Sequence, residues 1–222
     1  MNAGIVYSVI SALGLAITFF IARYWSKNVG KGGNAVSMGL TIALVAYVIA
    51  MLPFMLPFAA AALALNVIVL CLARFYGVKL LFPGGLTPAE SLYLGLGFAI
   101  FVVAAPMVFG GVWKLQEAIG ALEIATQLLL TICGITVMIG MGVITGYALY
   151  KNDVKTILYT LLTQVLYVLP EYFSQSGITV FHSNILYAAY SALVAGGVFY
   201  YTRIMYNRWK DETAPTIIET ES

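Results

Sequence analysis

The sequence predicts an all-α fold: a polytopic membrane protein built as a seven-helix transmembrane bundle, with its N-terminus outside and its C-terminus in the cytoplasm. Three observations predict it. Hydrophobic residues make up 62% of the chain and charged residues only 9%, whereas a soluble domain has roughly 25% charged residues. The apolar residues gather in tracts of membrane-spanning length, separated by short polar loops. The basic residues fall almost wholly into alternate loops.

The first expected span, residues 3–24, is a retained transmembrane helix rather than a signal peptide. It has no basic segment ahead of its apolar run and no obvious cleavage site. Its charges, Arg23 and Lys27, follow the apolar run instead. We therefore expect the N-terminus to lie outside.

The next apolar tract, residues 35–75, is too long for one span. As one helix, at roughly 1.5 Å per residue, it would be about twice as long as a hydrocarbon core of roughly 30 Å is thick. Pro53 and Pro57, in the stretch MLPFMLPF, each remove a backbone donor and disfavour helix in the preceding residue. We therefore expect a tight turn there, between spans at residues 35–52 and 58–75.

The later spans follow the same pattern, and the fourth has the best-specified start. Thr87 and Glu90 can form a capping box around Pro88, directly after the chain breaker PGG. The remaining spans are expected at residues 91–113, 121–150, 154–170 and 183–206. The acidic tail, residues 211–222, has no apolar periodicity, so we expect it to be flexible and cytoplasmic.

The distribution of charge supports this topology. With the N-terminus outside, ten of the eleven Lys and Arg residues fall on the cytoplasmic side, Arg74 among them, and only Lys114 falls outside. If MLPFMLPF were a kink within one helix, the basic residues would divide four against seven. The net charge of +2 is small, and the basic residues fall between apolar tracts rather than in one patch. We therefore expect a lipid bilayer, in the cell (plasma) membrane, as the surrounding partner, and no nucleic acid.

The sequence lacks the residues of most redox and metal chemistry. Cys71 and Cys133 each lie alone in an apolar tract, and His182 is the single histidine. Bis-histidine haem ligation and histidine-rich zinc sites therefore lack their ligands. No potassium-filter, nucleotide-loop, serine-hydrolase or zinc-protease motif occurs. We expect no catalytic residue, no cofactor and no metal.

Seven spans with an outside N-terminus is also the topology of microbial rhodopsins and of SWEET sugar transporters. The seventh tract, SNILYAAYSALVAGGVFYY, has no lysine for a retinal Schiff base. The first and last three spans show no internal repeat. The chain therefore resembles neither family beyond its topology.

Small residues at four-residue spacing favour close approach between helices. They are Gly4, Ser8 and Ala12 in the first span, Gly142 and Gly146 in the fifth, and Ala192 and Gly196 in the seventh. Such faces pack helices within one bundle or form the seam of a homo-oligomer, and the sequence leaves both open.

Two polar stripes are the candidate functional features. In the sixth span polar residues recur at three- and four-residue steps, so they share one helix face. A second stripe lies near the outer end of the fifth span. These side chains either hydrogen-bond between helices or line a solute pathway, a quinone site or a lipid-headgroup site in the outer half of the membrane. The candidate site residues are Gln127, Thr131, Thr160, Gln164, Tyr167 and Glu171.

Two classes of function remain open. One is a cofactor-free integral membrane subunit or assembly factor of a larger complex, for example a respiratory complex with other membrane subunits. The alternative is a small permease or channel for a neutral or weakly polar solute, and a third is a lipid-modifying membrane enzyme. The acidic residues fall at or beyond the span ends, so a proton-driven mechanism lacks its usual carboxylates.

Overall fold

The computed structural model describes residues 32–50, 59–104, 121–175 and 184–213, together with single positions between residues 5 and 20. Within this part of the chain the secondary structure is helical throughout, with no strand, as the sequence predicts. The elements are α2 (Gly32–Ala50), α3 (Ala59–Leu81), α4 (Pro88–Ala99), the π-helical turn η2 (Ile100–Ala104), α6 (Ala121–Lys151), α7 (Val154–Gln175) and α8 (Asn184–Thr213).

Helices α2 and α3 are separate and run in opposite directions. A Cβ atom built at Gly77 of α3 would lie 3.0 Å from Ile42 of α2, whereas Ala46 of α2 packs against Leu70, further back along α3. The stretch MLPFMLPF itself lies outside the described residues. The chain nevertheless reverses direction between the end of α2 and the start of α3, as the two-helix interpretation requires.

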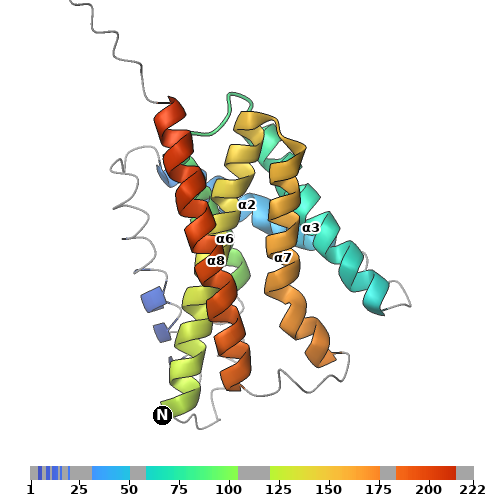
Figure 1. Ribbon diagram of the computed structural model, residues 1–222, viewed down its shortest axis with the longest axis vertical. Coiled ribbons are helices and arrows are strands. Elements are labelled where there is room, and N and C mark those ends of the chain that lie inside the picture. The colour runs from blue at the N-terminus through green and yellow to red at the C-terminus, as the bar shows by residue number, and fades with distance from the viewer. Residues whose placement is uncertain are drawn as a thin grey trace, which may run out of the picture.

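Helix α6 lies at the centre of the bundle, with α7 and α8 beside it in Figure 1. It approaches α4 closely, since a Cβ atom at Gly142 would lie 2.5 Å from the Cα of Gly95. Gly146 lies against the ring of Trp209 in α8. The expected small-residue face of this helix is therefore used inside the bundle. For Gly196 on α8, the described part of the chain offers no such neighbour within 4 Å.

The contacts of the first helical positions place them against α6. Val6 and Ile10 pack on Ile124 and Leu128, and a Cβ atom at Gly14 would lie 3.0 Å from Thr131. The residues that contact α6 are therefore at positions 6, 10 and 14. The small-residue face expected from the sequence was Gly4, Ser8 and Ala12, and of these Ala12 is exposed.

The start of α4 agrees with the predicted capping box. The Thr87 hydroxyl accepts a hydrogen bond from the Glu90 backbone N–H at 3.2 Å. The Glu90 carboxylate accepts one from the Thr87 N–H at 2.9 Å. These two bonds satisfy donors that a helix start otherwise leaves unpaired, and Pro88 fits the first turn because it has no N–H to satisfy.

Helix α3 is longer than expected. It continues to Leu81, beyond the expected end of this span at residue 75, because no strong helix breaker occurs before Pro83. As a result Arg74, expected among the loop charges of the cytoplasmic side, lies inside the helix with only 1% of its surface exposed. Trp209, near the C-terminus of α8, is likewise fully buried.

Helix α7 continues through Pro170 to Gln175, beyond the expected end at residue 170. A proline has no N–H, so it leaves the carbonyl four residues earlier, that of Leu166, without its helical partner. The Tyr190 hydroxyl of α8 donates a hydrogen bond to that carbonyl at 2.8 Å. The neighbouring helix thereby replaces the bond that the proline removes.

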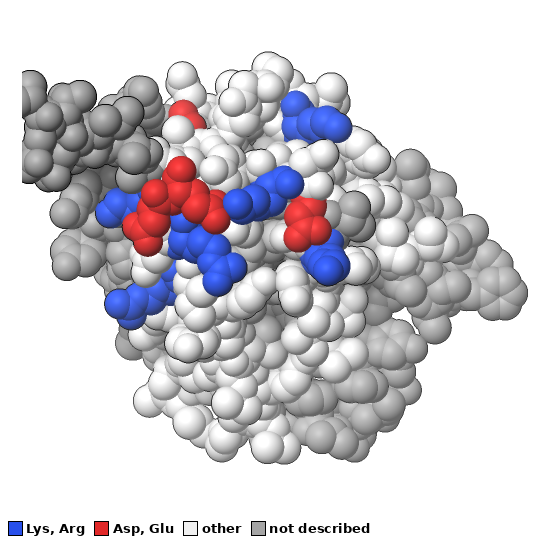
Figure 2. Space-filling model, turned by 45° about the horizontal axis from the view of Figure 1, so that its top comes forward, with Lys and Arg blue, Asp and Glu red and all other residues white. Residues whose placement is uncertain are grey.

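Most charged residues of the described part of the chain gather at one end of the molecule, at the top of Figure 1 and facing the viewer in Figure 2. We call this the charged end. It is formed by the C-termini of α3, α6 and α8 and the N-termini of α4 and α7. Its charged residues are Lys79, Glu90, Lys151, Asp153, Lys155, Arg208, Lys210, Asp211 and Glu212.

The flanks of the bundle expose large apolar side chains, among them Leu65, Ile68, Leu72, Leu158, Leu162, Ile185 and Leu193. Within the described residues, two helices are long and apolar enough to cross a membrane, α6 and the segment Ile185–Thr213 of α8. Shorter apolar helices occur at Asn34–Ile49 and Pro88–Val103.

Candidate functional site

The most unusual side chain in the bundle is that of Arg74, which lies among three other helices. Its Nη1 donates to the side-chain oxygen of Gln164 in α7 at 3.0 Å, and also to the sulfur of Met141 in α6 at 3.4 Å. Its guanidinium carbon lies 5.1 Å from the ring centroid of Phe98 in α4. A cation over an aromatic face at this distance is attracted by the ring.

The other two nitrogens of this guanidinium, Nε and Nη2, are buried without a hydrogen-bond partner in the described part of the chain. Because the group is planar, the N–H of Nε and one N–H of Nη2 point in the same direction and form one edge with two parallel donors. This edge matches the two oxygens of a carboxylate. We call it the free edge of Arg74.

No carboxylate among the described side chains pairs with Arg74. Its charged and polar surroundings are the amide of Gln164, the thiol of Cys71 and the phenol of Tyr167. A charge without an opposite partner is costly in an apolar interior. Among the described residues, the arrangement is therefore a buried cation with no anionic partner.

The depth of Arg74 follows from its partners. Phe98 and Gln164 each lie ten residues after the first residue of their helix, and Met141 lies ten residues before the last residue of its helix. All three of these helix termini are at the charged end. At roughly 1.5 Å per residue, the guanidinium lies about 15 Å below that end.

Part of the predicted polar stripe of α7 faces Arg74. Gln164 is 2% exposed, and Thr160, one turn closer to the charged end, is 5% exposed. Tyr167, one turn further away, is half-buried, and its hydroxyl approaches α6 closely, at 2.7 Å from a Cβ atom built at Gly134. Three of the six predicted site residues therefore lie together.

The predicted residues of α6 lie elsewhere. The Thr131 hydroxyl donates to the backbone oxygen of Gln127 at 2.8 Å, and its methyl group faces the N-terminal segment at Gly14. Thr131 lies twenty residues from Lys151, so it is about 30 Å from the charged end. The side chain of Glu171 lies outside the described residues. The polar face of α7 thus meets Arg74 of α3 and the middle of α6, at Gly134 and Met141, whereas Thr131 of the α6 stripe faces the N-terminal segment.

Sequence reasoning missed Arg74 because it ended the third span at residue 75. The sequence does contain a signal that the helix continues past residue 75. The apolar character resumes after Arg74 in FYGVKLLF, and the first strong helix breaker is PGG. A helix drawn to that breaker places Arg74 two turns inside its end.

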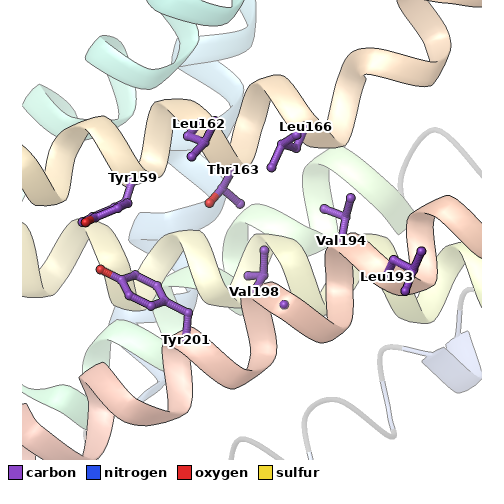
Figure 3. Close-up of a pocket in the computed structure, with 9 residues that line it drawn as sticks. Tyr159, Leu162, Thr163, Leu166, Leu193, Val194, Val198 and Tyr201 are labelled. Atoms are coloured by element: carbon purple, nitrogen blue, oxygen red, sulfur yellow. The ribbon is translucent and has the colours of Figure 1, made fainter.

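Two hollows lie near this site. One is a groove of about 400 Å³ between α7 and α8, where Tyr159, Leu162, Thr163 and Leu166 face Leu193, Val194, Val198 and Tyr201 (Figure 3). The other, of about 490 Å³, lies at the charged end between the turn after α3 and the turn between α6 and α7. We call the first the α7–α8 groove and the second the charged-end cavity.

Among the described residues, no group of three or more His, Cys, Asp or Glu side chains is placed to hold a metal ion. Comparisons with protein-family models, curated proteins and solved structures gave no match to this chain.

Proposed function

We propose that this protein is a multi-pass membrane permease that binds a small carboxylate-bearing solute at Arg74. Three observations support the membrane part of the proposal: the exposed apolar flanks, the charges gathered at one end and the alternating helix directions. In this proposal the bundle has seven spans, and the charged end is cytoplasmic.

The observation that carries the proposal is the free edge of Arg74. A hydrocarbon core is roughly 30 Å thick, so a guanidinium about 15 Å below the charged end would lie near its middle. Ionisable side chains at such depth are rare and mark solute or ion pathways. The free edge favours a carboxylate, which differs from the neutral solute that the sequence suggested.

The burial of Arg74 favours a small solute over a partner protein as the source of the anion. Its side chain is enclosed by α3, α4, α6 and α7, and 1% of its surface is exposed. A carboxylate on a helix of another subunit would have to displace one of these helices to reach it. A free solute needs only a transient opening between them.

The test is binding by the purified protein in mild detergent, measured as a shift in thermal unfolding. Butyrate and pyruvate serve as carboxylate probes, and butyramide serves as the uncharged control. A ligand at about 100 times its Kd stabilises a protein by about 2.7 kcal/mol, which is several degrees for a chain of this size. We expect either carboxylate to raise the unfolding temperature, and butyramide to leave it unchanged.

Two substitutions identify the site. Arg74→Met keeps an unbranched side chain that can fill most of the same space but removes the charge, so the carboxylate effect should disappear while the protein still folds. Arg74→Lys keeps a charge but lacks the two parallel donors, so it should bind more weakly than the wild type. The proposal is wrong if neither carboxylate stabilises the wild type, or if both variants respond as the wild type does.

Transport is the second measurement. Proteoliposomes should take up labelled butyrate faster than protein-free liposomes, and Arg74→Met should reduce uptake to the protein-free rate. Arg203→Met is the matched control, because Arg203 is an exposed arginine on α8 away from the site. Equal loss in both variants would contradict a specific role for Arg74.

A second candidate function is that of a subunit in a larger membrane complex, and the outer face of α8 favours it. A Cβ atom built at Gly196, or at Gly197 on the rim of the α7–α8 groove, meets no described atom within 4 Å, so a helix of another protein can approach closely there. Purification in mild detergent followed by mass spectrometry tests this candidate, which predicts a stoichiometric partner. A lone species that moves butyrate would favour the permease.

A further inference from the structure

The charged-end cavity lies above Arg74 along the same helix faces. Ala148 lines the cavity and lies seven residues from Met141, and Ile157 lines it and lies seven residues from Gln164. Seven residues are about two helical turns, so each pair shares a face and is separated by about 10 Å along the axis. The cavity and the arginine are therefore in line.

Helical register places one layer of buried side chains between the cavity and Arg74. Helices α3, α6 and α7 each contribute one residue to it, about one turn closer to the charged end than Arg74, Met141 and Gln164. They are Val78 of α3, Ile144 of α6 and Thr160 of α7, which are 0%, 0% and 5% exposed. Val78 and Ile144 are apolar, and Thr160 is small and carries a hydroxyl group. A solute could pass between these side chains once their helices move apart.

The chemistry of the cavity suits an anion with a small apolar body. Lys79 supplies a positive charge at its wall, and Phe75, Tyr76 and Phe82 supply apolar surface. Among the described residues that line the cavity, Lys79 is the one charged side chain. Asp153 is close in sequence but does not line the cavity, and its carboxylate accepts from the Lys155 N–H at 2.9 Å and the Thr156 hydroxyl at 3.3 Å. The wall itself therefore carries a positive charge.

We infer that the charged-end cavity is the entrance from which a carboxylate solute reaches Arg74, with Lys79 as the charge that attracts it. This inference rests on the proposed function. The layer of Val78, Ile144 and Thr160 is closed in this structure. Passage requires α3 to move relative to α6 and α7, which would bring the free edge of Arg74 into reach from the cavity.

The first test reverses the charge at the cavity wall. Lys79→Glu is compared with Lys155→Glu, which makes the same change at an exposed lysine of the same end, outside the cavity. We expect Lys79→Glu to raise the butyrate concentration for half-maximal uptake by about tenfold or more, and Lys155→Glu to change it far less. Equal effects of the two variants would overturn the inference.

The second test blocks the cavity by modification. A Cβ atom at Gly84 meets nothing within 4 Å, so Gly84→Cys fits without strain, and Lys155→Cys is the matched control. The two native cysteines are buried. A negatively charged methanethiosulfonate reagent should stop butyrate uptake by Gly84→Cys but not by Lys155→Cys. Butyrate should slow the modification of Gly84→Cys, whereas butyramide should not.

The outcomes separate the inference from the proposal on which it rests. If Arg74→Met abolishes uptake but Lys79→Glu and modified Gly84→Cys transport normally, the entrance lies elsewhere and the permease proposal stands. If Arg74→Met transports normally, both are wrong. If anionic lipid vesicles rather than butyrate protect Gly84→Cys, the cavity binds a lipid headgroup and the inference is wrong.

Discussion

The hydrogen bond from Tyr190 to the Leu166 carbonyl offers a direct test of how this bundle accommodates a proline inside a helix. Tyr190→Phe removes the hydroxyl and keeps the ring. The Leu166 carbonyl then loses its donor, because Pro170 has no N–H to offer. Leaving a carbonyl unsatisfied in an apolar setting costs about 1–3 kcal/mol.

The magnitude should fall near the lower end of that range. Hydrogen bonds between helices in membrane bundles contribute about 0.6 kcal/mol on average and at most about 1.7, and Leu166 is partly exposed on the flank of the bundle. We therefore expect Tyr190→Phe to cost about 1 kcal/mol. For a chain of this size that is about 2–4 °C in Tm.

A double-mutant cycle makes the test specific. Pro170→Ala restores a backbone N–H at position 170, which can bond to the Leu166 carbonyl within the helix. In that background Tyr190→Phe should cost almost nothing, and other contacts of Tyr190 cancel because both backgrounds share them. Tyr200→Phe, an exposed tyrosine on the same helix, is the control. An equal cost of Tyr190→Phe in both backgrounds would refute the reasoning.

Three further predictions concern packing, capping and topology. Gly142→Ala places a Cβ atom 2.5 Å from α4 and should cost about 1–3 kcal/mol in unfolding free energy. The control Gly196→Ala meets no described atom and should be neutral or stabilising. Similar Tm values for the two variants would contradict the close packing of α6 on α4. Thr87→Ala should cost about 1 kcal/mol and Thr87→Ser much less in the same assay, and equal losses would exclude the capping role. In intact cells an impermeant maleimide should label Ala121→Cys and not Lys155→Cys, and the reverse pattern would invert the topology.

Features encoded along the chain could be predicted from the sequence. The capping box at Thr87 depends on residues three positions apart, so it can be recognised from the sequence alone. The reversal between α2 and α3 follows from the length of the apolar tract and its two prolines. The polar face of α7 follows from its periodicity, and its members Thr160 and Gln164 are indeed buried.

The partner of that polar face could not be predicted, because periodicity shows which residues share a face and not which helix covers it. The sequence suggested the α6 stripe at Gln127 and Thr131, whereas the structure places Arg74 of α3 against Gln164 and brings Tyr167 close to Gly134 in the middle of α6. Arg74 was misplaced for a related reason. A basic residue near a helix end can lie in the loop or inside the bundle, and only the packing of α3 on α6 and α7 decides between them.

If α3 spans a membrane, as proposed, the contacts of Arg74 add little net stability to the bundle. Inserting an arginine at the centre of a membrane helix costs about 2.5–3.5 kcal/mol on insertion scales. Its hydrogen bond to Gln164 returns about 1.5–3 kcal/mol and the ring of Phe98 about 0.5–2 kcal/mol, so the known contacts roughly offset the cost. A well-packed apolar side chain of similar size would do at least as well. On the proposed function, a carboxylate solute at the free edge would supply two charge-assisted hydrogen bonds and an opposite charge together, which no described side chain supplies.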